Sequence, residues 1–187
     1  MAQPAGLRRR KRPLNRLLGP LAGLAALLSL QPVQAQNLFQ PVYEVLQHPR
    51  CSNCHTDTAG PLQRNSRPHL PPVQRGPEGK GEGSLACGTC HRERNSATTP
   101  GAPDWRMPAH GSNVFRGRSE AGLCRQLRDP ARNGGLQPEA LGRHFAEDPL
   151  IGWAWNAGAG RAAPRLARDE LVAAVAAWLR AGAPCPD

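Results

Sequence analysis

Aromatic side chains are scarce in this sequence: of its 187 residues, three are Phe, four are Trp and one is Tyr. So few aromatic residues are a poor inventory for a large apolar core. Gly and Pro contribute 20 residues each, which favours loops over long regular elements. The length excludes a TIM barrel, and also a doubly wound domain joined to a substrate domain. We therefore expect something besides the chain's own side chains to fill its interior.

Acidic residues are missing from the start of the chain, where the first is Glu44. Six of the 24 basic residues lie within the first 16 positions, followed by an apolar run over residues 17–30 and a small-x-small ending at Ala35. This order is typical of a secretory signal peptide, residues 1–35, that is cleaved after Ala35. The alternative is an uncleaved membrane anchor, although the run is short for a bilayer span. We expect export to a bacterial periplasm and no stable membrane anchor after cleavage.

The charge of the remaining chain is modest. From residue 36 onward, 18 basic residues stand against 14 acidic ones, a net charge of +4. A dispersed charge of this size is ordinary for a solvated surface and forms no phosphate-binding stripe. We therefore expect no nucleic-acid partner.

The pattern of elements changes along the mature chain. A short helix begins at Pro41, with Val42, Val45 and Leu46 on one face. Residues 61–118 are rich in Gly and Pro and lack an alternating strand pattern. Helices are predicted over residues 119–127, 138–145 and 167–181, the last with an amphipathic stripe and a stop at Gly182.

Two motifs of the form C-x-x-C-H carry the chemistry of the sequence. They are Cys51 to His55 and Cys87 to His91. This pattern is the attachment signal of c-type haem, in which both thiols form thioethers with the haem vinyl groups and the histidine binds the iron. The thioether positions are Cys51, Cys54, Cys87 and Cys90, and the proximal iron ligands are His55 and His91. The predicted cofactors are two covalent haem c groups.

The predicted fold class follows from these motifs: mainly α, with short helices and long loops packed around two covalent c-type haems, as in cytochrome c. Residues 36–187 form one dihaem domain, with a loop-rich haem-binding part at 36–118 and a helical part at 119–187. A Cys₄ zinc site is the main alternative for the four thiols, but it ignores both histidines. A thioredoxin-like redox pair would need a βαβ context, which is absent.

The remaining cysteines and the second axial ligands complete the candidate residues. Cys124 and Cys185 have no C-x-x-C partner, so in an oxidising compartment they are predicted to form a disulfide. Electron carriers bind the far face of the haem iron with histidine or methionine. The candidates for that position are His48, His69, Met107 and His144, with His110 as the weakest.

The sequence also resembles a family of small exported proteins described as isoquinoline 1-oxidoreductase subunit. The resemblance extends over nearly the whole mature chain and rests on these segments: HPRCSNCH at 48–55, RPH at 67–69, PVQRG at 72–76, PGAP at 100–103 with Trp105, CRQL at 124–127, NGG at 133–135, DPL at 148–150, and Cys185-Pro186. Isoquinoline 1-oxidoreductase itself is a molybdenum hydroxylase with iron–sulfur clusters. This chain has no ferredoxin-like cysteine run and is too small for a molybdopterin domain. The resemblance therefore implies an associated cytochrome that accepts electrons from such an enzyme.

The expected function is electron transfer, and the chain itself is expected not to be an enzyme. The predicted electron donor is an exported dehydrogenase or molybdenum hydroxylase. The alternatives are a haem enzyme such as a small peroxidase, which would need an open sixth iron position and a distal acid–base residue, and a haem-based sensor.

Overall fold

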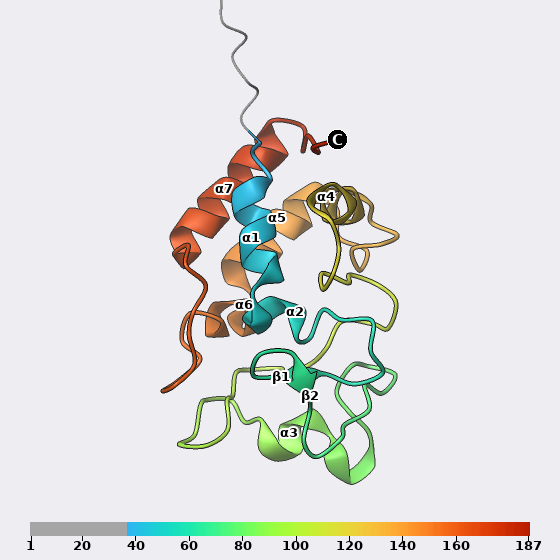
Figure 1. The fold of residues 1–187 in the computed structure, drawn as a ribbon, viewed down its shortest axis with the longest axis vertical. Coiled ribbons are helices and arrows are strands. Elements are labelled where there is room, and N and C mark those ends of the chain that lie inside the picture. Colours follow the sequence, from blue (N-terminus) through green and yellow to red (C-terminus); the bar gives the residue numbers. More distant parts are fainter. Residues whose placement is uncertain (1–36) are drawn as a thin grey trace, which may run out of the picture. The chain divides into compact units, whose positions relative to one another are not determined.

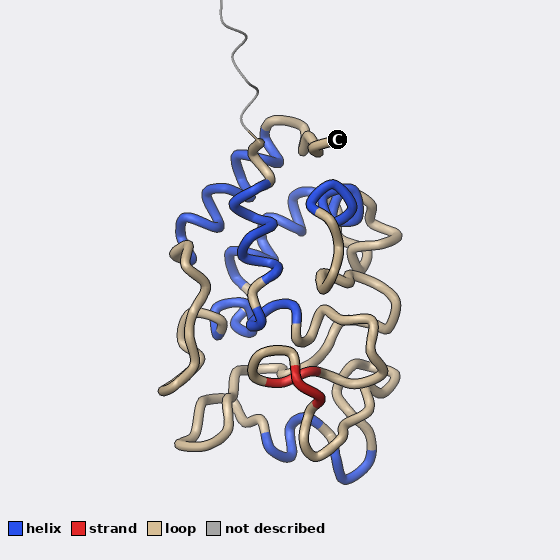
Figure 2. The backbone as a smooth tube through the Cα atoms, viewed as in Figure 1, coloured by secondary structure: helices blue, strands red, loops and turns tan. Residues whose placement is uncertain are grey.

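The computed structural model describes residues 37–187, so the predicted signal peptide lies outside the described residues. The elements in chain order are α1 (Gln40–Gln47), α2 (Pro49–Ser52), β1 (Leu62–Gln63), β2 (Arg67–Pro68), the 3-10 helix η1 (Gly83–Leu85), α3 (Cys87–Cys90), α4 (Glu120–Arg128), α5 (Pro138–Glu147), α6 (Pro149–Trp153) and α7 (Arg168–Arg180) (Figures 1 and 2). Within this described part, none of the helices combines the length and the apolar character that a membrane crossing requires.

Local sequence signals explain where the longer helices begin and end. Pro41 lies in the first turn of α1, where its missing N–H costs no hydrogen bond. The Ser119 hydroxyl caps α4 by accepting from the Gly122 amide at 3.2 Å. At the start of α7, a Glu170 carboxylate oxygen accepts from the Ala167 amide at 2.9 Å. The predicted helices near Pro41 and over residues 119–127, 138–145 and 167–181 are therefore confirmed to within two residues at each end.

A single apolar cluster holds the longer helices together. α1 packs against α4 and α7, and α5 packs against α7. At its centre the ring centroids of Phe39 and Trp178 lie 5.1 Å apart, and neither side chain is exposed to solvent. Phe115 and Phe145 also belong to the cluster. All three Phe side chains and Trp178 thus lie in one small core, together with buried Leu and Val side chains.

The predicted disulfide is confirmed. Cys124 in α4 is bonded to Cys185, which follows α7, with their Cα atoms 5.6 Å apart. The bridge ties the C-terminal end of the chain to α4 at the edge of the apolar cluster. Trp178 reinforces the same junction, because its indole N–H donates to the Pro184 carbonyl at 3.0 Å.

The predicted fold class is wrong. Helices account for only 37% of the described structure, and nothing in it indicates helices packed around haem. The longer helices pack on one another through the apolar cluster, and the first C-x-x-C-H motif reaches the edge of that cluster through Cys51 and through His55, which stacks on Phe115. The scarcity of aromatic residues was misleading. Half of them meet in one cluster, and this cluster gives the helical part an interior built from its own side chains. The described helices therefore do not form a cytochrome c-like shell around two haems.

The rest of the described chain is a loop-rich part (residues 53–118), in which β1 and β2 form an antiparallel pair with Leu62 opposite Pro68. Figure 1 shows β1, β2 and α3 away from the longer helices, beyond α2 and α6. Two-residue strands are too short to leave an alternating pattern in a sequence, which explains why they were not predicted. The four-residue helices α2 and α3 were also not predicted, and each contains the first cysteine of a C-x-x-C-H motif.

Candidate functional site

The two C-x-x-C-H motifs adopt the same local backbone structure. In the first, the His55 amide donates to the Cys51 carbonyl at 3.0 Å, and in the second, the His91 amide donates to the Cys87 carbonyl at 2.8 Å. Each motif is therefore one helical turn that ends at its histidine. Residues three apart in a helical turn lie on the same side, so both thiols of a motif are brought to one side.

The two motif histidines are held in the same way. The Nδ1–H of His55 donates to the Asn113 carbonyl at 2.8 Å, and that of His91 donates to the Pro100 carbonyl at 2.8 Å. A carbonyl oxygen only accepts, so the proton must sit on Nδ1 and the lone pair on Nε2 is free. This is the arrangement of a metal-binding imidazole, whose other nitrogen is held by a backbone or carboxylate oxygen.

An aromatic side chain also supports each motif imidazole. Phe115 stacks on His55 with ring centroids 3.8 Å apart, and Trp105 stacks on His91 with centroids 4.2 Å apart. Neither aromatic residue was predicted from the sequence to stack on a motif histidine. The only available signal was Trp105 in the family-like segment after Pro103, because the stacking partners are distant in sequence from both motifs.

Burial keeps both motif histidines neutral. It lowers the pKa of His55 to about 4 and also lowers the pKa of His91, since the charged imidazolium is the form that burial disfavours. A neutral imidazole is the form that binds a metal. Both motif histidines are thus in the protonation state and the tautomer that a haem iron needs.

The four motif thiols are not paired with one another. Burial raises the pKa of Cys51 to about 12 and that of Cys54 to about 11, and it also raises the pKa of Cys87. A redox-active C-x-x-C pair has a lowered thiol pKa, and Cys51, Cys54 and Cys87 lack that signature. Among residues 37–187, no group of three or more His, Cys, Asp or Glu side chains is arranged so that it could hold a metal ion.

The two motifs open onto one cavity of about 990 Å³ in the loop-rich part. Cys54 comes to it from the first motif, and Cys87, Cys90 and His91 come from the second, whereas Cys51 and His55 of the first motif are not part of its lining. Its described lining contains no Asp or Glu but includes four arginines: Arg50, Arg64, Arg67 and Arg161. A volume of this size lies at the upper end for small-molecule and cofactor pockets. The apolar and aromatic walls with arginines suit a flat, apolar ring that carries carboxylates, so the lining around the second motif fits haem.

Three of the predicted distal ligands line this cavity. His69 follows β2, and its Nδ1–H donates to the Pro71 carbonyl at 2.8 Å. His48 caps α2, and its Nδ1 accepts from the Arg50 amide at 3.2 Å. Met107 is buried in the lining, with 4% of its surface exposed. His110 is exposed and does not line the cavity.

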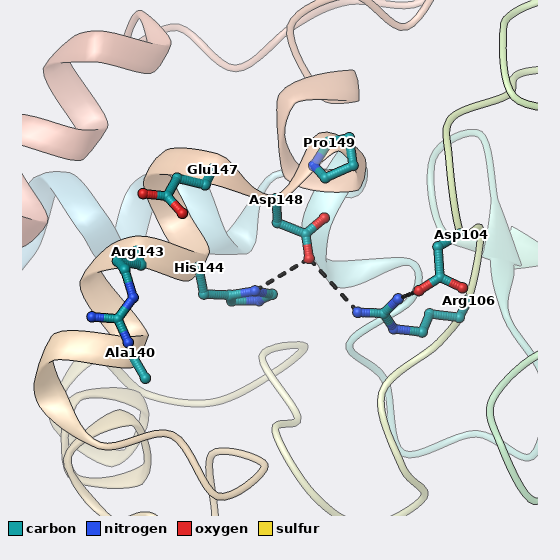
Figure 3. Close-up of a pocket in the computed structure, with 8 residues that line it drawn as sticks. All are labelled: Asp104, Arg106, Ala140, Arg143, His144, Glu147, Asp148 and Pro149. Carbon is teal, nitrogen blue, oxygen red and sulfur yellow. Dashed lines mark ion pairs between the residues drawn. The ribbon is translucent and has the colours of Figure 1, made fainter.

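His144 lies elsewhere, on α5, beside a second cavity of about 390 Å³ (Figure 3). Its Nδ1 is 3.2 Å from an Asp148 carboxylate oxygen, and this hydrogen bond is the main cause of a lowered pKa of Asp148. Arg106 reaches the same Asp148 oxygen at 3.7 Å. The charge of His144 contributes to the lowered pKa of His55, so the two imidazoles lie within electrostatic range of each other.

A buried arginine connects the first motif to the cavity wall. Arg75, 4% exposed, donates through its guanidinium to the carbonyls of Thr56, Thr58 and Pro108. Thr56 directly follows His55, and Pro108 directly follows Met107. Arg75 lies in one of the family-like segments, at 72–76, but its role could not be predicted from the sequence, because only the fold brings its carbonyl partners together.

Comparison with known proteins adds no relative to this description: no family model, no curated protein and no solved structure matches the chain.

Proposed function

We propose that the chain is a dihaem c-type cytochrome that carries electrons. One haem c would be held by Cys51, Cys54 and His55, and the other by Cys87, Cys90 and His91. The observation that carries the proposal is the shared state of His55 and His91: each imidazole donates from Nδ1 to a backbone carbonyl at 2.8 Å, stacks on an aromatic ring and keeps Nε2 free. Two unrelated structural histidines would have no reason to share all three features.

The chain's own residues have defined roles in this proposal. The thiols anchor each haem, and His55 and His91 bind iron through Nε2. Arginines in the cavity lining attract the haem carboxylates, because no described lining residue is acidic. When bound, haem c supplies a one-electron Fe(III)/Fe(II) couple. Cys54 and Cys87 come from different motifs and line the same cavity, which supports electron exchange between the two centres.

The partner and the compartment are part of the same proposal. The disulfide between Cys124 and Cys185 supports an oxidising compartment, which we infer to be the periplasm. The resemblance to the isoquinoline 1-oxidoreductase subunit family supports an exported molybdenum hydroxylase or related dehydrogenase as electron donor. The contact with that donor should be small and transient, below about 1,200 Å² of buried surface, because a carrier leaves after each transfer.

Covalent haem content is the direct test of the proposal. The chain is expressed with its leader in a host that matures c-type cytochromes, and its intact mass and pyridine haemochrome spectrum are measured. We expect two covalent haems per chain. The pairs C51A/C54A and C87A/C90A should each remove one haem, whereas the matched control C124A/C185A should keep both. Bound zinc without haem absorbance would overturn the assignment.

Spectra and reduction kinetics then separate a carrier from an enzyme or a sensor. A carrier should have two low-spin haems that do not respond to carbon monoxide, and it should oxidise no N-heterocycle and consume no peroxide at enzymatic rates. Stopped-flow mixing with a molybdenum hydroxylase and its substrate should reduce it, with a shallow dependence on salt because the net charge after residue 35 is only +4. A high-spin haem that binds carbon monoxide would favour the sensor or enzyme instead.

A further inference from the structure

The imidazole rings of His69 and His91 are neighbours in the lining of the loop-rich cavity. Their ring centroids are 6.1 Å apart and their planes are inclined by 61°. His69 belongs to the segment after β2, and His91 follows α3, so the fold brings together two segments that are separate in the sequence. Both residues line the same cavity as the thiols of the second motif.

Both imidazoles have the tautomer of a metal ligand. The Nδ1–H of His69 is held by the Pro71 carbonyl, and that of His91 is held by the Pro100 carbonyl, each at 2.8 Å. Since a carbonyl accepts only, each Nε2 retains its lone pair. A structural histidine pair gains nothing from two free Nε2 atoms, whereas a metal held between the rings uses both.

The spacing suits one metal atom between the two rings. A metal–nitrogen bond of about 2.0 Å on each side, plus the roughly 1 Å from each nitrogen to its ring centroid, puts two axial imidazoles about 6 Å apart. An edge-to-face aromatic pair would also fall within about 4.5–7 Å. The distance alone therefore does not decide between the two, and the matching tautomers are the observation that does.

The other candidates on this cavity fit less well. The Nδ1 of His48 accepts from the Arg50 amide, so the ring proton of neutral His48 is on Nε2, which then has no lone pair for iron. The Met107 amide donates to the Gly79 carbonyl at 2.8 Å, and its side chain is buried, with 4% of its surface exposed. His69 is the candidate for which both the position and the tautomer agree.

We infer that His69 is the second axial ligand of the iron whose first ligand is His91, so that this haem has two histidine ligands. The inference rests on the proposed function, because it needs a haem on Cys87 and Cys90. It gives the segment between the two motifs one residue, His69, that would hold the second haem together with His91.

The test uses the C51A/C54A chain, which retains only the haem at Cys87 and Cys90. We expect this haem to be low-spin and unreactive with carbon monoxide. Adding H69A should leave the haem attached through its thioethers but make it high-spin and able to bind carbon monoxide, and added imidazole should restore the low-spin spectrum. The matched control H110A, at an exposed histidine, should change neither property.

Three results would overturn the assignment of His69: a low-spin haem in the H69A chain, a high-spin haem before that substitution, or loss of the low-spin state in H48A or M107L instead. If H69A does not accumulate, H69M replaces it. That variant should stay low-spin with a higher reduction potential, since methionine raises the potential of a haem iron, and an unchanged potential would count against His69. Absence of haem from the unmodified chain would instead overturn the proposed function and, with it, this inference.

Discussion

His91 and Trp105 lie face to face, with ring centroids 4.2 Å apart and planes only 1° from parallel. With its Nδ1–H on the Pro100 carbonyl, His91 is restrained both in the ring plane and against the ring face. Trp105 is itself supported by Trp153, whose ring lies edge-on at 4.8 Å. The direction of the His91 Nε2 atom is thus set by contacts that do not require a bound group.

Replacing Trp105 should loosen this arrangement. We expect W105L to lower the free energy of unfolding by about 0.5–1.5 kcal/mol for the lost stack, with further loss from the reduced burial. W105F keeps an aromatic face and should recover most of the difference. Denaturant unfolding of the three chains measures the effect, and equal midpoints for W105L and the unmodified chain would contradict it.

Arg75 should be among the most sensitive polar positions. R75M removes a buried guanidinium from three carbonyls and leaves them without that donor, so we expect a loss of roughly 3 kcal/mol or more in the free energy of unfolding. R75K should recover only part of the loss, because an ammonium does not match the planar fork. The matched control R116M, at an exposed arginine, should stay near the unmodified stability, and a comparable loss in that control would remove the specific role of Arg75.

The disulfide should stabilise the fold without affecting the motifs. Cys124 and Cys185 are separated by 61 residues, so C124A/C185A should cost roughly 2–4 kcal/mol in unfolding free energy. Haem attachment should be unchanged, since the bridge lies at the apolar cluster and not at the cavity. Thiol counting on the denatured, oxidised chain checks the bridge directly, and two reactive thiols at these positions would disprove it.

His144 has the same tautomer as His69 and His91, because its Nδ1–H faces the Asp148 carboxylate. It also lies within electrostatic range of His55. In the C87A/C90A chain, which retains only the haem at Cys51 and Cys54, we expect H144A to convert a low-spin haem into a high-spin one. Optical and paramagnetic resonance spectra measure the change. The H110A control should not change the spectrum. If H144A also leaves it unchanged, His144 on α5 is not the second ligand of the first haem.

Features that depend on neighbouring residues could be predicted from the sequence. Proline at the start of α1, the Ser119 cap of α4 and the apolar period of α7 act over one or two turns, so those helices were predicted correctly. The C-x-x-C-H motifs were identified for the same reason, since their chemistry is contained in five consecutive residues. The Cys124–Cys185 pair was found by elimination, as the only two cysteines outside those motifs.

The tertiary structure decided what composition and spacing could not. Whether a few aromatic residues form a core depends on which helices pack together, and Phe39 and Trp178 meet although 139 positions separate them in the sequence. Which histidine has a free Nε2 depends on the nearest carbonyl or amide: Pro71, Pro100 and Asn113 accept from Nδ1, whereas the Arg50 amide donates to His48. The sequence by itself determined which residues carry thiols and imidazoles, and only the fold decided which imidazoles face each other, because hydrogen-bond partners are chosen by proximity in space.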